Sequence, residues 1–284
     1  MTNITELIKE LRTKTGAGFL DCKKSLEENN NDIEKAIDSL RKKGLSKASK
    51  KSDREANEGA IGVYSNENIT AIIKVNSETD FAAKSDTFLN FLDELGSIAI
   101  DNAGINITKE DFLNLKYNNT LISEFFDSMI AKIGENLILN DLVILDKRHS
   151  DYSFYIHNSY KKNIGKIISL VQYNTKNNDD TIKLLAKNLC MHIAAMKPES
   201  LDVQDLDEVK IKNEEKIQRE LILNSGKPSN IVDKILQGKM KKYFSEVTLL
   251  NQSYILDQDK NVGTIINDYK DFDFKIISFA LISL

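Results

Sequence analysis

The sequence ITAIIKVNSETDFAAKSDTFLNFLDEL, residues 69–95, decides the fold class of this chain. Residues 69–75 are mostly β-branched and predict a half-buried strand, because such side chains suit a pleated surface. Residues 88–95 carry apolar side chains at helical spacing and predict an amphipathic helix. A strand that leads directly into a packed helix indicates an α+β fold.

The residues between strand and helix, Thr79-Asp80-Phe81-Ala82-Ala83-Lys84, place a carboxylate beside an aromatic ring at the rim of this scaffold. An apolar ring on such a corner either packs locally or belongs in a pocket on another protein. Local packing is a real alternative, since Phe81 could staple a helix that Asp80 caps. These six residues leave both interpretations open.

The same order of elements occurs twice along the chain. Two strands and a helix are predicted in each half: 59–65, 69–75 and the helix after Asp80 in the first, and 153–157, 164–173 and 180–196 in the second. Each half alone would leave one sheet face bare. The pattern therefore predicts two related subdomains of one duplicated α+β core, with a final strand within 272–284.

Residues 1–44 carry three short amphipathic patterns and predict a three-helix bundle near the lower size limit for independent folding. Asn3 and Asn31 are the expected caps of the first and third helices, and Gly44 is the expected end of the third. The inward face of the second helix is expected to hold Phe19, Cys22 and Leu26. Leu20 falls off that face, close to the basic side chains of Lys9, Arg12 and Lys23, which suits docking onto an acidic, partly apolar helix.

Charge is distributed unevenly. The net charge is -4, yet residues 1–54 hold 13 Lys and Arg against 9 Asp and Glu. The overall acidity argues against a direct nucleic-acid role. The apolar-poor stretch 45–58 is expected to be a basic linker, and a solvated linker is the simplest interpretation. The alternatives are steering toward an acidic partner and loose contact with ribosomal RNA.

Residues 207–241 predict a helical-hairpin arm. A mainly charged helix over 207–224 is broken at Ser225-Gly226-Lys227-Pro228, and apolar residues then restart a helix at Ile231. This pattern is typical of an antiparallel coiled coil.

The two cysteines, Cys22 and Cys190, lie on apolar helical faces and are expected to be buried thiols in a reducing compartment. The sequence contains no run of about 18 apolar residues, and the first helix begins too early to leave room for a leader. We therefore expect a soluble, cytoplasmic protein of a bacterial cell.

Enzyme chemistry has little support in the sequence. His149, His157 and His192 lack metal-ligand spacing, and His192 lies in an apolar helix that favours a structural role. The chain has no Gly-rich phosphate loop and no recognisable nucleophile motif. We expect no catalytic residue, no metal ligand and no cofactor.

A series of motifs, in order along nearly the whole chain, resembles the elongation factor Ts family. The motifs are Arg12, Thr15-Gly16-Ala17-Gly18, Asp21-Cys22-Lys23-Lys24, Asp32-Ile33-Glu34-Lys35-Ala36, Thr79 to Lys84, Ala131-Lys132-Ile133-Gly134-Glu135-Asn136, Met191-His192-Ile193-Ala194-Ala195, Lys197-Pro198, Ser225 to Pro228 and Gly238-Lys239-Met240-Lys241-Lys242-Tyr243. The implied organisation is a UBA-like bundle (1–44), a basic linker (45–58), core subdomain N (59–148), core subdomain C (149–206 and 242–284) and the arm (207–241).

The resemblance implies a guanine-nucleotide exchange factor of the GTPase elongation factor Tu, acting during translation elongation. Phe81 would be a wedge that disturbs the Mg²⁺ and phosphate site of the partner, with Thr79, Asp80 and Ala82 beside it; a valine is more usual at position 82. The other implied partner contacts are Lys9, Arg12, Phe19, Leu20, Lys23 and His157, the last within a Tyr-x-His pattern before an expected long polar loop, 158–163. In this family the arm serves dimer contacts in some members and partner contacts in others.

Two alternatives belong to other functional classes. An adaptor would use the bundle alone to recruit a protein, so deleting residues 1–54 would abolish all binding. An enzyme could use Asp80 and His157 as an acid–base pair and would turn over without a partner.

Overall fold

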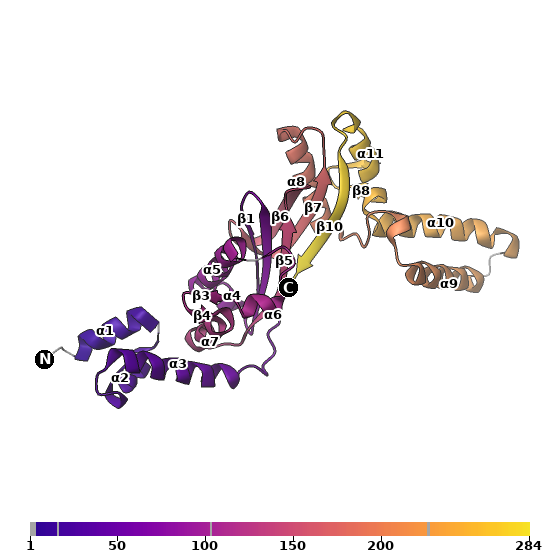
Figure 1. Cartoon of the computed structure of the whole chain (residues 1–284). Helices are drawn as coiled ribbons and strands as arrows, with labels where there is room; N and C mark the ends of the chain where they lie inside the picture. The colour runs from indigo at the N-terminus through magenta and orange to yellow at the C-terminus, as the bar shows by residue number, and fades with distance from the viewer. Residues whose placement is uncertain (1–3, 16, 103, 226–227) are drawn as a thin grey trace. The chain divides into compact units, whose positions relative to one another are not determined.

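The computed structural model describes residues 4–15, 17–102, 104–225 and 228–284. The chain divides into two compact units: unit 1 comprises 1–148, 158–166 and 283–284, and unit 2 comprises 149–157 and 167–282. Three helices precede a sheet-containing core (Figure 1), so the predicted α+β class is confirmed. None of the helices in the described ranges combines the length and apolar character that a membrane crossing requires.

Unit 1 opens with the predicted three-helix bundle: α1 (Ile4–Thr15), α2 (Phe19–Glu28) and α3 (Ile33–Ser49). One apolar face of each helix is buried in a shared core of Ile8, Leu11, Cys22, Leu26 and Ala36. The buried Ser25 hydroxyl donates to the carbonyl of Ala36 at 2.9 Å, which ties α2 to α3 without leaving a polar group unpaired.

The N-terminal cap of α3 is Asp32 and not Asn31. The Asp32 carboxylate accepts the backbone N–H of Lys35 at 3.1 Å. Asn31 instead takes φ 62° in the preceding turn, a left-handed conformation that asparagine tolerates. The expected cap Asn3 and the turn residue Gly16 lie outside the described residues.

The predicted end of α3 at Gly44 is wrong, because the helix continues to Ser49. The first residues of the expected linker, 45–49, are therefore helical. At Gly44 the helix lies against α7 (Ile122–Ile133): a Cβ added there would meet the Cβ of Ala131 at 3.5 Å. Gly44 therefore lies at the contact between the two helices and does not stop α3.

The sheet of unit 1 is built on the predicted hairpin of β1 (Glu58–Ser65) and β2 (Ile69–Ser77). An additional strand that the sequence did not predict, β5 (Leu137–Asp146), pairs antiparallel with the other edge of β2. Because β2 is central, it is buried along almost its whole length, and the expected half-buried strand is wrong in this respect. The turn at 66–68 is closed by the Asn66 side chain, which accepts two backbone N–H groups at 2.9 Å.

Helices cover this sheet. The predicted helix is split into the short α4 (Asp80–Ala83) and the long α5 (Asp86–Asn102), and it is followed by α6 (Lys109–Leu113), the small strands β3 (Lys116–Tyr117) and β4 (Thr120–Leu121), and α7. The centre of the core is aromatic: the Phe91 ring of α5 contacts the rings of Phe125 and Phe126, each at 4.9 Å between centroids. This packing fixes α7 and the turn that follows it.

The second predicted strand pair and its helix are β6 (Asp151–Lys161), β7 (Ile164–Asn174) and α8 (Asp180–Met196). They lie mainly in unit 2, and residues 158–161 of β6 belong to unit 1. The bounds of α8 are as predicted. The expected long loop after His157 is wrong, because β6 continues to Lys161 and Asn158 absorbs a local distortion at φ 52°. The first residues of β7 belong to unit 1, where Ile164 and Gly165 pair with β1; both β6 and β10 (Lys275–Ser283) pair with β7.

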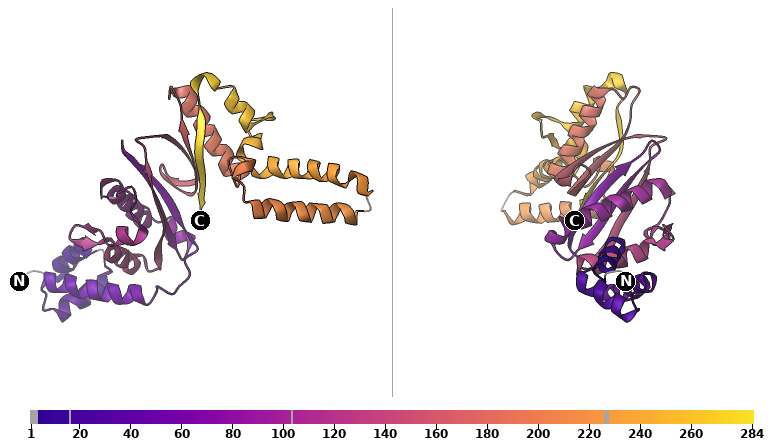
Figure 2. Two further views of the ribbon diagram at one scale, coloured as in Figure 1. Left: turned by 45° about the vertical axis from the view of Figure 1, so that its right-hand side comes forward. Right: turned by 90° about the vertical axis from the view of Figure 1, so that its left-hand side faces the viewer.

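Two long helices of unit 2, α9 (Glu208–Asn224) and α10 (Ser229–Val247), lie side by side as the predicted antiparallel hairpin (Figure 2). Their shared apolar residues are Ile222, Val232, Leu236 and Met240, and Arg219 pairs with Asp233 at 2.9 Å. The break at Gly226 and Lys227 lies outside the described residues. The remaining elements are the 3-10 helices Val203–Asp205, Leu249–Asn251 and Lys270–Phe272, β8 (Ser253–Tyr254), β9 (Asp257–Asn261) and α11 (Val262–Asn267). The finer division into linker, subdomains and arm stays a prediction.

His192 on α8 is fully buried, as predicted for a structural histidine. Its Nε2 lies 2.9 Å from Oε1 of Gln252, and its Nδ1 accepts the backbone N–H of Ile255 at 3.3 Å, which fixes the neutral tautomer. Burial lowers the pKa of His192 below its ordinary value, with the Gln252 hydrogen bond opposing that shift.

We expect the free energy of unfolding to fall as the pH drops below about 6.5, because the unfolded chain binds a proton at His192 more readily than the folded chain does. The contribution is complete above that pH. Denaturant titrations between pH 7.5 and pH 5.5 measure the slope, and His192→Gln should flatten it. An equal slope in the wild type and His192→Gln would contradict the assignment.

Candidate partner-binding surface

The loop between β2 and α5 begins with a helix cap. Thr79 is the N-cap of α4, and its hydroxyl accepts the backbone N–H of Ala82 at 3.2 Å. The alternative in which Asp80 caps this helix is therefore wrong. Asp80 instead occupies the first turn, where its carboxylate accepts a 2.6 Å hydrogen bond from Nζ of Lys84. The Lys84 ammonium holds the pKa of the Asp80 carboxyl below its usual range.

One turn of helix sorts the loop residues into two groups. Ala82 and Ala83 are buried and attach α4 to the core. Phe81 points away from that core and is 83% exposed. This exposure rules out the alternative in which Phe81 packs on its own helix. Ala82 anchors the loop, and its place among partner-contacting residues stays a prediction.

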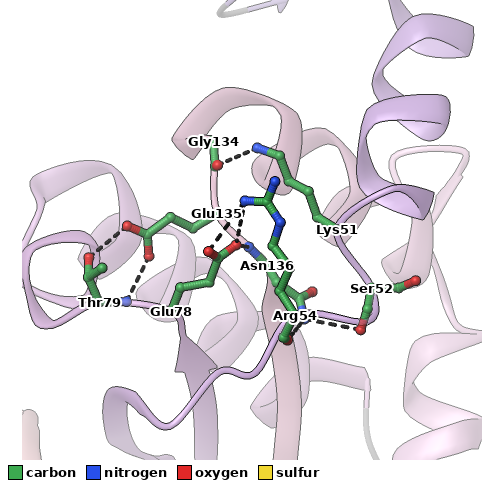
Figure 3. A network of polar contacts seen from close by, with 8 residues as sticks. All are labelled: Lys51, Ser52, Arg54, Glu78, Thr79, Gly134, Glu135 and Asn136. Atoms are coloured by element: carbon green, nitrogen blue, oxygen red, sulfur yellow. Dashed lines mark hydrogen bonds and ion pairs between the residues drawn. The ribbon is translucent and has the colours of Figure 1, made fainter.

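The loop is held by the turn between α7 and β5, a contact that the sequence did not predict. The carboxylate of Glu135 accepts the backbone N–H of Thr79 at 2.9 Å and the Thr79 hydroxyl at 2.6 Å (Figure 3). Two hydrogen bonds that Thr79 donates to one carboxylate fix both the position and the rotation of the loop entrance. Phe81 is thus an exposed ring on a rigidly held backbone.

A second set of contacts joins this loop to the chain that follows α3. The backbone N–H of Asn136 donates to Glu78 at 2.7 Å, and Arg54 lies 3.4 Å from the Glu78 carboxylate. The side-chain amide of Asn136 donates to the carbonyls of Ser52 and Arg54 at 3.3 and 2.8 Å (Figure 3). The only feature of the sequence that indicates these contacts is the pair of polar residues that follows Gly134. Gly134 has φ 90° and ends α7.

The bundle offers a second exposed surface in unit 1. Lys9 and Arg12 of α1 and Phe19 of α2 line one open hollow of about 490 Å³. Phe19 was expected inside the bundle but is 49% exposed, because it begins α2 and its ring lies beyond the core. Leu20 is 77% exposed, as predicted, and Lys23 pairs with Glu27 at 3.8 Å. Of the five predicted bundle contacts, the structure brings three into one hollow and leaves Leu20 and Lys23 outside its lining.

His157 belongs to unit 2. It is exposed, and its Nδ1 lies 3.2 Å from the Tyr155 hydroxyl. The Tyr-x-His pattern therefore orients the imidazole locally within strand β6.

The contacts of Asp80 and His157 do not support an acid–base pair. The Asp80 carboxylate is engaged by Lys84, and the His157 ring by Tyr155. Among the residues that the structure describes, no group of three or more His, Cys, Asp or Glu side chains could hold a metal ion.

Known proteins are similar in sequence to most of this chain. The family model described as "Elongation factor TS" matches residues 78–284, which include the loop and its braces. The protein named "Elongation factor Ts" from Methylobacterium radiotolerans is 40% identical over 271 residues, covering 94% of this chain and 86% of that protein. Those from Rhodospirillum centenum and Syntrophotalea carbinolica are each 38% identical, and each match covers 92% of this chain and 85% of the relative. The chain therefore belongs to the elongation factor Ts family and has the role of a translation elongation factor.

Proposed function

We propose that this protein is a guanine-nucleotide exchange factor that binds elongation factor Tu·GDP and promotes GDP release. The observation that carries the proposal is Phe81, an aromatic ring that is 83% exposed on a backbone braced by Glu135. Leaving such a ring in water forgoes roughly 1.5–3 kcal/mol of burial free energy. A pocket on a partner recovers that free energy, and rigid aromatic side chains lose little entropy on binding.

The mechanism is displacement without covalent chemistry, so no catalytic residue or cofactor is needed. Mg²⁺ requires a near-ideal octahedral oxygen shell. An aromatic wedge beside the nucleotide site would move the ligands of that ion and weaken metal and phosphate binding together. Because linkage is reciprocal, GDP must weaken binding of this protein by the same factor.

The required free energy indicates a large interface. Each tenfold acceleration needs about 1.4 kcal/mol of preferential binding to the distorted state. Several decades therefore call for an interface above roughly 2,000 Å². We assign Thr79 and Asp80 to the approach of the loop, the bundle residues Lys9, Arg12, Phe19, Leu20 and Lys23 to a second contact, and His157 to a third. The proposed location is the cytoplasm.

The test is a release assay with elongation factor Tu from the same organism, loaded with fluorescent GDP. Adding the full chain should accelerate the fluorescence change at sub-stoichiometric amounts, with excess unlabelled GDP present. A GTPase outside translation serves as the specificity control. Release that stays at the spontaneous rate over a wide range of protein concentrations would refute the proposed function.

Leu20→Asp should weaken binding to the partner by about tenfold or more, since a charge replaces an exposed apolar side chain at an interface. The helical circular dichroism should not change, because Leu20 is 77% exposed. The control is Leu184→Asp, which alters an exposed helical leucine that the proposal does not use. Titration calorimetry with elongation factor Tu gives the affinities. Equal affinities for Leu20→Asp and the wild type would remove this surface from the interface.

A further inference from the structure

The turn Gly134-Glu135-Asn136 contacts two separate segments of unit 1. Glu135 holds the loop entrance at Thr79, while Asn136 holds the chain after α3 at Ser52 and Arg54. Neighbouring residues of one turn thus join the loop entrance at Thr79 to the segment that trails the bundle (Figure 3).

Glu135 opposes collapse of the Phe81 loop onto the surface of the protein itself. An exposed ring on a free loop would fold back onto nearby apolar surface, because that burial is favourable. The two hydrogen bonds from Thr79 to a single carboxylate remove the freedom at the loop entrance that such a collapse needs. Charge-assisted hydrogen bonds of this kind are stronger than neutral ones.

Asn136 fills a position that needs donors. Its side chain is only 2% exposed, and both of its side-chain contacts are made by the amide nitrogen toward backbone carbonyls. An aspartate there would present only acceptors to those carbonyls. Its backbone N–H donates to Glu78, which Arg54 also approaches. Glu78 directly precedes Thr79, so the two sets of contacts hold consecutive residues.

We propose that Glu135 and Asn136 are positioning residues: they hold the one-turn helix that carries Phe81 in a fixed position relative to the segment 51–54 that trails the bundle. This inference rests on the proposed exchange function for its effect on GDP release, although the brace itself is a property of the free protein. A preorganised loop loses less conformational entropy on docking, so the brace raises the rate at which a partner is engaged productively.

We call the contacts of Glu135 and Asn136 with Thr79, Glu78, Ser52 and Arg54 the brace. Two measurements test the brace and the exchange function separately. Amide hydrogen exchange of the free protein reports the mobility of the loop directly. In Glu135→Gln the amides of residues 78–84 should exchange about tenfold faster, while the amide exchange rates of β1 and α5 stay unchanged. The value of kcat/KM for GDP release should fall by about tenfold, because the loop must be reordered at each encounter. The matched control is Glu67→Gln, which alters an exposed glutamate on the turn at the other end of β2.

Variants at Thr79 provide a rescue test. Thr79→Ser keeps the hydroxyl that Glu135 binds and should keep the slow amide exchange of residues 78–84. Thr79→Val removes that hydroxyl together with its helix cap to Ala82, and should speed amide exchange at 78–84 at least as much as Glu135→Gln does. Asn136→Asp should loosen both 51–54 and 78–84. Because Thr79 and Glu135 act as a pair, combining Thr79→Val with Glu135→Gln should cost less than the sum of the single changes.

The outcomes are distinguishable. Unchanged amide exchange at 78–84 in Glu135→Gln overturns the brace, whatever happens to GDP release. Faster amide exchange throughout β1 and α5 would mean that Glu135 stabilises the whole unit, and this result would also overturn the brace. A loosened loop with normal kcat/KM overturns the positioning role. If the wild type itself fails to release GDP, the proposed function falls, and the amide-exchange result still decides the brace.

Discussion

Phe81→Ala should lower the stimulated rate of GDP release by about 100-fold, the factor expected when an aromatic side chain that anchors an interface is truncated. The free energy of unfolding should change by less than about 1 kcal/mol, because the ring is 83% exposed and contributes little to the core. Activity and stability should thus separate at this residue. The fluorescent-GDP assay and a denaturant titration of the same preparation measure the two quantities.

The matched comparison is Phe81→Leu, which keeps an apolar side chain of similar size and should retain much more activity than alanine does. Magnesium gives an independent check. Lowering free Mg²⁺ should speed spontaneous GDP release and shrink the advantage of the wild type over Phe81→Ala, if disturbance of the metal site is part of the mechanism. A Phe81→Ala protein with wild-type rates at every Mg²⁺ concentration would remove Phe81 from the mechanism while leaving the family assignment intact.

The elements that the sequence predicts well are those specified by local patterns. The bounds of α8 follow from apolar spacing along one helix, and the β1–β2 hairpin follows from two apolar runs around the polar turn at 66–68. The two helices of the arm follow from the charged segment and its break. In each of these elements, a few consecutive residues carry the information needed.

The errors arise where tertiary contacts override a local signal. Gly44 predicts a helix stop, yet α3 continues through it and lies against Ala131 of α7 there. Asn158 reads as the start of a loop, yet β6 absorbs it as a left-handed residue and continues to Lys161. Strand β5 carries two short apolar runs, 137–139 and 142–145, which periodicity alone does not assign to a strand, and its pairing with β2 joins residues about 70 positions apart.

The candidate site shows the same division. The residue types and order of 79–84 were sufficient to select the loop, but the choice between a packed and an exposed Phe81 depends on the surrounding fold. The brace was not predictable in this way, because Thr79 and Glu135 lie 56 residues apart and meet only after α7 packs on the core.

A slot for an aromatic ring in unit 1 is formed by two glycines. Tyr64 of β1 is 9% exposed, and its hydroxyl donates to Asp93 at 3.1 Å. Burial and the nearby Asp93 carboxylate raise the pKa of Tyr64, so the hydroxyl remains a donor. A Cβ added at Gly96 of α5 would lie 2.3 Å from two ring atoms, and one added at Gly62 would lie 2.5 Å from another. Both glycines therefore lie directly against the ring, and a methyl group at either position would overlap it.

Gly96→Ala should lower the free energy of unfolding of unit 1 by about 2 kcal/mol. Alanine in a helix interior is normally better than glycine by about 1 kcal/mol, but overpacking against a ring that cannot move costs about 3 kcal/mol. The control is Gly238→Ala in α10, where a new Cβ has nothing within 4 Å and should stabilise the chain by about 0.5–1 kcal/mol. Amide exchange in α5 and α10 reports each helix separately, which avoids assuming a single unfolding transition.

In a Tyr64→Ala background the slot is empty, so the effect of Gly96→Ala on the free energy of unfolding should change sign and become stabilising. If Gly96→Ala destabilises equally with and without the tyrosine ring, the clash is not its cause, and the two glycines have another role in the packing of α5 on the sheet.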